Sequence, residues 1–321
     1  MNASCIFPAI IRLAMIACLM ITASACDRDK EYTSVDFRTK SVKAPAKTQD
    51  MVEPILQIAV AAMISPKETL VYYRELIDYL GSKLNRNTLL IQRKTYGEIN
   101  DLLSKNQIDI AFICSGPYVL NGNPSGFQAI ATPIIRGSPL YQAYLIVHSD
   151  SPFQKLEDLK GRSFAFTDPH SNTGFIVPRY WLSLMNTNPE TFFGSTIFTF
   201  SHDNAIMAVA KHLVDAASVD SLYWEYYQTR NPYYSARTRV IQKSEAFGSP
   251  PIVVSDALST DLIERLTHIL LTMHQDPEGQ RILSGLLVDR FESPKAEWYD
   301  PIRKMAERLS LEGSRDAYGA R

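Results

Sequence analysis

Along most of the chain, short apolar runs alternate with longer stretches in which apolar side chains recur every three or four residues. The short runs predict strands, and the periodic stretches predict amphipathic helices. Residues 55–61 form one apolar run, and Leu76, Ile77 and Leu80 then recur at helical spacing. Repetition of this strand–helix–strand pattern predicts an α/β protein built on parallel sheets that helices cover.

The same pattern places the remaining elements. It predicts strands at residues 89–93, 108–114, 127–135, 140–148, 163–167, 197–200, 216–220, 239–242 and 252–254. It predicts a helix from about residue 96 and further helices at residues 177–185, 202–214, 222–228, 261–273, 278–287 and 296–309. Before the helix that contains Leu76, Ser65 suits the N-cap, Pro66 suits the first helical position and Glu68 completes a capping box.

The N-terminus has a different pattern. An apolar run of thirteen residues extends from Leu13 to Ala25, which is shorter than the ~20 residues that span a membrane. Arg12 precedes the run, and small residues stand directly before Cys26. Residues 1–25 are therefore predicted to be a secretory signal peptide, and Cys26 is predicted to become a lipid-modified N-terminus. The alternative is an ordinary cleavage site with an incidental cysteine.

Residues 26–53 lack an apolar period and predict a flexible lipidated tether. A tether of this length would hold the following domain about 25–30 Å from a bilayer. Asp27, directly after the lipidated cysteine, favours retention at the inner membrane of a cell with two membranes. The protein is therefore expected to be exported and to stay anchored on the periplasmic side, by lipid alone. Only Cys114 remains as a free thiol, so no internal disulfide is expected.

Composition narrows the possible functions. Apolar residues make up 45% of the chain and charged residues 21%, which excludes wholesale disorder. A formal charge of −1, from 33 basic and 34 acidic residues, gives no electrostatic footprint for nucleic acid. The six histidines include no H-E-x-x-H pair, and G-x-S-x-G and phosphate-loop motifs are absent. No enzymatic activity, metal site or cofactor is therefore expected, although an exported hydrolase remains the rival from another functional class.

The segment F-T-D-P-H-S-N-T-G-F-I-V-P joins a predicted strand to a predicted helix. Pro178 lacks the N–H that a helix interior needs, so it belongs in the first turn and places the helix start near residues 172–174. Ser171, Asn172 and Thr173 then surround free N–H groups at a helix N-terminus, and the next residue, glycine, permits close approach. Such an end binds anions. The alternative is a capping turn without a ligand.

Two further strand-to-helix turns carry polar side chains. His202 stands at the start of the next helix, where neighbouring N–H groups disfavour imidazolium and a neutral ring can still donate one hydrogen bond. Asp220 ends a strand and Ser221 follows it. A carboxylate beside an anion site selects a ligand that carries a proton. The alternatives are a structural histidine and a solvent-facing N-cap aspartate.

These three turns, in this order, resemble the phosphate-, phosphite- and phosphonate-binding (PhnD-like) proteins of ABC importers, within the periplasmic binding protein class. The segments D-P-H-S-N-T-G-F-I-V-P and S-H-D-N-A-I-M-A-V-A-K-H-L-V-D-A-A carry the resemblance. Supporting segments are S-P-K-E-T, I-D-I-A-F, S-P-P-I-V-V and D-P-E-G-Q-R-I-L, so the likeness extends from about residue 55 to residue 308.

The resemblance implies a two-lobed (type II) fold in which each lobe is a mainly parallel sheet flanked by helices, with the ligand cleft between the lobes. Residues 54–147 and 251–310 would form lobe 1, residues 148–250 lobe 2, and residues 311–321 a tail. Ser171, Asn172 and Thr173 would cradle the anion and His202 would donate to it. Asp220 with Ser221 would hold its protonated oxygen. Tyr96, Ser65 and Ser115 would form the wall from lobe 1.

The resemblance also implies a monomeric solute-binding protein that captures phosphate, phosphite or a small alkylphosphonate and docks on an ABC permease in the inner membrane. Members that bind an aminoalkyl phosphonate use carboxylates to hold its ammonium group, whereas the aligned positions here are Leu222 and Pro250. Binding of 2-aminoethylphosphonate is therefore expected to be weak, since an unpaired buried ammonium is costly. A tethered sensor or an orphan binding protein of the same fold remains the alternative.

Overall fold

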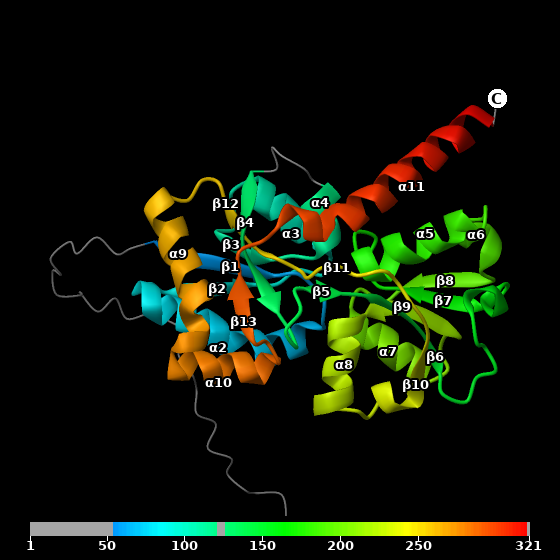
Figure 1. Cartoon of the computed structure of the whole chain (residues 1–321), viewed down its shortest axis with the longest axis horizontal. Helices are drawn as coiled ribbons and strands as arrows, with labels where there is room; N and C mark the ends of the chain where they lie inside the picture. The colour runs from blue at the N-terminus through cyan, green and yellow to red at the C-terminus, as the bar shows by residue number, and fades with distance from the viewer. Residues whose placement is uncertain (1–53, 121–125, 320–321) are drawn as a thin grey trace, which may run out of the picture. The chain divides into compact units, whose positions relative to one another are not determined.

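The computed structural model describes residues 54–120 and 126–319, which form three sheets and the helices that cover them (Figure 1). The segments predicted to be the signal peptide and the tether, with Cys26, lie outside these residues. Within the described part of the chain, no helix has the length and apolar character that crossing a membrane needs.

The first sheet has six strands. In spatial order they are β13 (Arg290–Glu292), β4 (Phe127–Ile134), β12 (Ile252–Ser255), β3 (Ile110–Phe112), β1 (Leu56–Val60) and β2 (Thr88–Ile91). Strand β1 lies parallel to both β2 and β3, whereas β12 runs antiparallel to β3 and β4. Helices α2 (Pro66–Leu84), α3 (Tyr96–Ser104), α4 (Ser115–Leu120), α9 (Thr260–Thr272) and α10 (Pro277–Leu286) belong to this first lobe, with the short η5 (Met273–Gln275).

The second sheet repeats this plan. Its order is β10 (Thr238–Lys243), β6 (Ala143–His148), β9 (Ala216–Asp220), β7 (Ser163–Phe166) and β8 (Ser195–Phe198). Strand β7 is parallel to β8 and β9, and β6 is antiparallel to β9 and β10. The second lobe also contains α5 (Val177–Leu184), α6 (Pro189–Phe192), α7 (His202–Ala210), α8 (Ser221–Arg230), η2 (Leu156–Leu159), η3 (Asn172–Ile176) and η4 (Ser235–Arg237).

The chain crosses between the two sheets in an antiparallel ribbon of β5 (Leu140–Tyr141) and β11 (Phe247–Gly248). The ribbon explains why the prediction of mainly parallel sheets is wrong and both sheets are mixed. Strands β12 and β6 each follow the ribbon into a lobe, and so run opposite to the parallel strands beside them.

The boundary expected near residue 147 lies earlier in the chain. Strand β6, which was predicted as part of residues 54–147, pairs within the second sheet. The apolar pattern of residues 140–148 predicts strand but carries no information about the sheet that the strand joins.

The last helix also departs from the expected division. Helix α11 (Asp300–Gly319) follows β13 of the first sheet through η6 (Ala296–Tyr299), and residues up to 310 were expected in lobe 1. Its buried side chains Ile302 and Met305 instead pack in one core with Phe164, Trp181 and Leu182 of the second lobe. The end of the chain therefore completes the second core.

Candidate functional site

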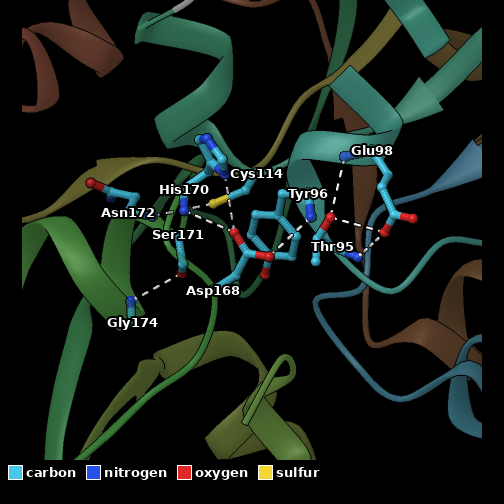
Figure 2. Close-up of polar contacts among 9 residues, drawn as sticks. All are labelled: Thr95, Tyr96, Glu98, Cys114, Asp168, His170, Ser171, Asn172 and Gly174. Atoms are coloured by element: carbon cyan, nitrogen blue, oxygen red, sulfur yellow. Dashed lines mark hydrogen bonds and ion pairs between the residues drawn. The ribbon is translucent and has the colours of Figure 1, made fainter. Parts of the chain in front are cut away.

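The turn after β7 meets the first lobe through hydrogen bonds that Figure 2 shows. Asp168 Oδ2 accepts from the N–H of Tyr96, the first residue of α3, over 3.0 Å. The N–H of Asn172 approaches Cys114 Sγ at 3.5 Å. Gly116 allows this approach, because a Cβ there would lie 2.7 Å from the carbonyl oxygen of His170. The two lobes are thus closed on each other at this turn.

A second contact between the lobes involves the start of α7. The N–H of His202 donates to the carbonyl oxygen of Met63 over 2.9 Å. The N–H of Ser65 donates to Asp203 Oδ1 over 3.0 Å. The first turn of α7 is therefore held against the turn between β1 and α2, and His202 is 1% exposed.

The helix after β7 begins where Pro178 predicted it would, at Asn172, although its first turn is a π-helical one. Ser171 is the N-cap, and its Oγ accepts from the N–H of Gly174 over 3.0 Å. Gly174 is required for internal packing, since a Cβ there would overlap Thr167 Oγ1. Ser171 and Gly174 thus already pair with each other inside this turn.

Asn172 and Thr173 contribute unpaired polar atoms. Both residues are fully buried, and neither Asn172 Oδ1 nor Thr173 Oγ1 has a hydrogen-bond partner. Asn172 Nδ2 donates to the hydroxyl of Tyr141 over 3.1 Å, which fixes the side-chain amide. The N–H of Thr173 lies in the first turn, where the helix itself offers no acceptor. These atoms can bind a small polar ligand.

The protonation of His202 follows from its surroundings. Burial lowers the pKa of His202 to about 3, so the ring is neutral near pH 7. Burial is the cause, rather than the neighbouring N–H groups that the sequence suggested. Nδ1 accepts from the N–H of Asp220 over 3.2 Å. The ring proton must then reside on Nε2, which becomes a neutral donor.

Asp220 has the N-cap position of α8, but it is buried rather than solvent-facing, with 2% exposure. Its Oδ1 accepts from the N–H of Leu222 over 2.7 Å. Burial raises the pKa of Asp220 to about 7, although the N–H groups of Leu222 and Tyr223 oppose that shift. This carboxyl group can share one proton with a ligand near neutral pH.

The structure gives Ser221, Ser115 and Ser65 different surroundings. Ser221 Oγ accepts from the N–H of Gln142 over 3.0 Å, which ties α8 to the chain after β5. Ser115 Oγ donates to the carbonyl oxygen of Gly248 over 2.7 Å, so its proton is already used. Ser65 is the N-cap of α2, but its side chain makes no capping hydrogen bond.

The capping box expected between Ser65 and Glu68 is therefore wrong, because the backbone of Ser65 instead faces Asp203 of the other lobe. A complete capping box occurs at α3, between Thr95 and Glu98 (Figure 2).

Tyr96 extends the site from the first lobe. The residue is 1% exposed, and its hydroxyl has no hydrogen-bond partner. Burial is the largest cause of its strongly raised pKa, and Asp168 and Asp220 add to the rise, so both carboxyl groups are electrostatic neighbours of this hydroxyl. The phenol therefore stays protonated and can donate to a ligand.

Sequence reasoning did not single out three residues that contribute here. Asp168 lies in the quoted D-P-H-S-N segment and connects the lobes. Ser201, directly before His202, has a buried hydroxyl without a partner. The ring of Tyr223 stacks on the ring of His202 with centroids 5.8 Å apart. The position of Ser201 at a helix start could have indicated its role, whereas nothing in the sequence indicates that Tyr223 stacks on His202.

The site as a whole offers neutral donors and one acid. It brings together Asn172, Thr173, His202, Asp220 and Tyr96, none of which carries a fixed positive charge. In the part of the chain that the structure describes, no cluster of three or more His, Cys, Asp or Glu side chains could hold a metal ion. The arrangement can bind an oxyanion by hydrogen bonds from dipoles, with one proton shared.

Comparison with known families agrees with this geometry. The family described as "ABC transporter, phosphonate, periplasmic substrate-binding protein" matches residues 58–299. The chain belongs to this family. Its members are substrate-binding proteins of ABC transporters, so the two-lobed fold and the function class predicted from the sequence are confirmed.

Curated relatives support the same assignment. The phosphonates-binding periplasmic protein of Escherichia coli is 25% identical over 301 residues, covering 90% of this chain and 86% of the relative. The phosphate-import protein PhnD of Mycolicibacterium smegmatis is 22% identical over 261 residues, covering 78% of each chain.

Solved structures show the fold. The binding protein component of an ABC phosphonate transporter from Pseudomonas aeruginosa is 22% identical, with a TM-score of 0.74, over 79% of this chain and 85% of that one. PhnD1 from Prochlorococcus marinus, in complex with methylphosphonate, is 18% identical, with a TM-score of 0.71, over 80% of this chain and 98% of that one.

Proposed function

We propose that this phosphonate-family binding protein captures a phosphorus oxyanion between its lobes and presents it to an ABC permease. The observation that carries the proposal is the set of buried hydroxyl donors without partners, those of Tyr96 and Thr173. A buried polar group left unsatisfied costs about 1–3 kcal/mol. A ligand that pairs with both of them recovers these costs only in the closed form, and so favours closure.

The ligand's oxygens divide between two kinds of partner. Tyr96, Thr173 and His202 donate to ionised oxygens, and Asp220 accepts from the oxygen that carries a proton. Sulfate at neutral pH has no proton to offer, so the ionised form of Asp220 would repel it, and only the protonated form could donate to it. The site therefore selects a singly protonated phosphorus oxyanion over sulfate.

Names of the relatives support this ligand class. The relative from E. coli is named for phosphonates and the one from M. smegmatis for phosphate, and the P. marinus structure holds methylphosphonate. The resemblance aligns Leu222 and Pro250 of this chain with positions at which members that bind an aminoalkyl phosphonate carry carboxylates. Binding of 2-aminoethylphosphonate is therefore proposed to be weak.

The proposal includes a cellular arrangement. The signal peptide of residues 1–25 directs export, and lipid on Cys26 anchors the mature protein on the periplasmic face of the inner membrane. The tether of residues 26–53 leaves the domain free to reach its permease. The protein acts as a single chain, and closure around the ligand creates the surface that docks.

Calorimetry on the purified protein, first freed of ligand by partial unfolding and dialysis, tests the proposal. Phosphate, phosphite, methylphosphonate, 2-aminoethylphosphonate and sulfate are titrated in turn. At least one phosphorus oxyanion is expected to bind with sulfate inactive, and Asp220→Ala is expected to weaken binding about 10- to 150-fold.

Asp215→Asn is the matched control, because Asp215 only accepts from Ser163 within the second lobe. Absence of binding for every phosphorus compound would refute the proposed function. Unchanged affinity in both Asp220→Ala and His202→Ala would refute the site.

A further inference from the structure

A cavity of about 100 Å³ lies between the lobes beside the candidate site. Its walls are mainly apolar and come from both lobes. They include Met63, Tyr73 and Val288 of the first lobe and Leu222 and Tyr223 of the second. Sequence reasoning gave no indication of this cavity, because its walls combine segments that are distant along the chain.

Residues of the cavity wall contact residues of the anion site. Tyr223, which lines it, stacks on His202, and the carbonyl of Met63 accepts from the N–H of His202. Leu222 follows Asp220 by two positions, and its N–H is the donor to Oδ1 of that residue. A group bonded to an anion held by His202 and Asp220 therefore has the cavity as its neighbour.

Four polar side chains in the cavity wall already have partners. The hydroxyls of Tyr73 and Tyr223 lie 3.3 Å apart and pair with each other. Glu225 accepts from the hydroxyl of Tyr144 over 2.6 Å and forms an ion pair with Arg136. Glu225 is thus already neutralised, and an ammonium group entering the cavity would have to compete with Arg136 for it.

We infer that the cavity binds an apolar substituent on the phosphorus atom, so that the preferred ligand is a phosphonate with a short alkyl chain. This inference rests on the proposed function. A cavity of this size is smaller than the ~150 Å³ that admits benzene, and so suits about three or four carbon atoms in a chain. Phosphate and phosphite have no substituent and leave the apolar wall uncovered.

An alkyl series tests the inference. Methyl-, ethyl-, propyl- and butylphosphonate are titrated by calorimetry into the purified protein, with phosphate and phenylphosphonate as references. Each methylene that enters the cavity should raise affinity about fourfold, which corresponds to about 0.8 kcal/mol per buried CH₂. The increase is expected to stop at propyl or butyl, and phenylphosphonate is expected to bind more weakly than propylphosphonate.

Two variants give independent readouts. Val288→Phe fills the cavity from a half-buried position, so the affinity for propylphosphonate should fall at least tenfold while the affinity for methylphosphonate stays unchanged.

The second variant is Arg136→Asn, which suits the left-handed backbone of that residue and removes the partner of Glu225. This variant should bind 2-aminoethylphosphonate with at least fivefold higher affinity than the parent protein does.

The outcomes separate the two proposals. Equal affinities along the alkyl series, or affinities that fall from methyl to propyl, overturn the inference and leave the proposed function standing. Loss of methyl- and propylphosphonate binding to the same extent in Val288→Phe also overturns it. If no phosphorus oxyanion binds, the proposed function fails, and this inference fails with it.

Discussion

The main-chain N–H of Asp220 donates to Nδ1 of His202, and this one hydrogen bond fixes which ring nitrogen of the histidine carries the proton. The two residues begin and end different elements, since His202 opens α7 and Asp220 closes β9. Their pairing orients an Nε2–H donor and a carboxyl group within the same buried site. Together the two groups can bind an anion without a positively charged side chain.

The first prediction concerns the two nitrogens of His202. His202→Gln places an amide donor near the position of Nε2, whereas His202→Asn preserves only a partner for the N–H of Asp220. We expect affinity for the bound oxyanion to fall about 10- to 150-fold in His202→Asn and less in His202→Gln, because a lost hydrogen bond to a charged group is worth about 1.5–3 kcal/mol. Calorimetry on both variants measures this, and equal losses would contradict the assigned tautomer.

The second prediction concerns stability against pH. Burial raises the pKa of Asp220 from 3.8 to about 7, so its stabilising effect is present below pH 4 and is lost as the pH rises to 7. Burial lowers the pKa of His202 from 6.5 to about 3, so its stabilising effect is present above pH 6.5 and is lost as the pH falls to 3. Between pH 4 and 6.5 the two effects oppose each other.

Removing one group should therefore expose the other. Relative to the parent protein, the Tm of His202→Gln should rise as the pH is lowered from 7 to 4. The Tm of Asp220→Asn should fall over the same range. Thermal unfolding of ligand-free protein at several pH values measures both slopes, and slopes of the same sign in the two variants would contradict the assignment.

The third prediction concerns lobe closure at Gly116. In Gly116→Ala the new Cβ would lie 2.7 Å from a backbone oxygen of the other lobe, so the closed form must shift apart. We expect at least a tenfold loss of ligand affinity and a small change in Tm without ligand. Gly285→Ala is the matched control, since a Cβ there meets nothing within 4 Å. Similar affinities in the two variants would show that closure tolerates the methyl group.

The fourth prediction uses Cys114 as a reporter of opening. The thiol is 2% exposed, burial raises its pKa to about 11, and its sulfur accepts from Asn172 of the other lobe. Labelling by a disulfide-exchange reagent therefore requires the lobes to separate. Saturating ligand should slow labelling at least tenfold in protein beginning at residue 27, with Cys114→Ser as the blank. A rate that ligand leaves unchanged would contradict this closed arrangement.

Local chemistry allowed part of the site to be predicted from the sequence. Because proline lacks an N–H, Pro178 is restricted to the start of its helix, and the structure begins the helical segment at Asn172 as expected. The apolar pattern changes from that of a strand to that of a helix at Asp220. In the structure, β9 ends at this residue, which is also the N-cap of α8. Sequence could not distinguish a hydroxyl that caps its own turn from one that awaits a ligand, and Ser171 proved to cap.

Long-range contacts explain the remainder. Ser115 donates to Gly248, which is 133 positions away, and no local pattern encodes that partner. The apolar run at residues 143–148 predicts a strand, yet the sheet that this strand joins depends on where the chain crosses between the lobes. The cavity beside Tyr223 exists only because both lobes are folded and closed.

Helix α11 determines when the second lobe can finish folding. Its residues Ile302 and Met305 fill a core whose other members, such as Leu145 and Phe164, come much earlier in the chain. During synthesis the other residues of this core emerge before the last helix, so their apolar surface stays uncovered until that helix is available. A fragment that ends before Asp300 would therefore expose that surface and tend to aggregate. Completion of the second lobe therefore waits for a segment that is distant in the sequence and is synthesised near the end.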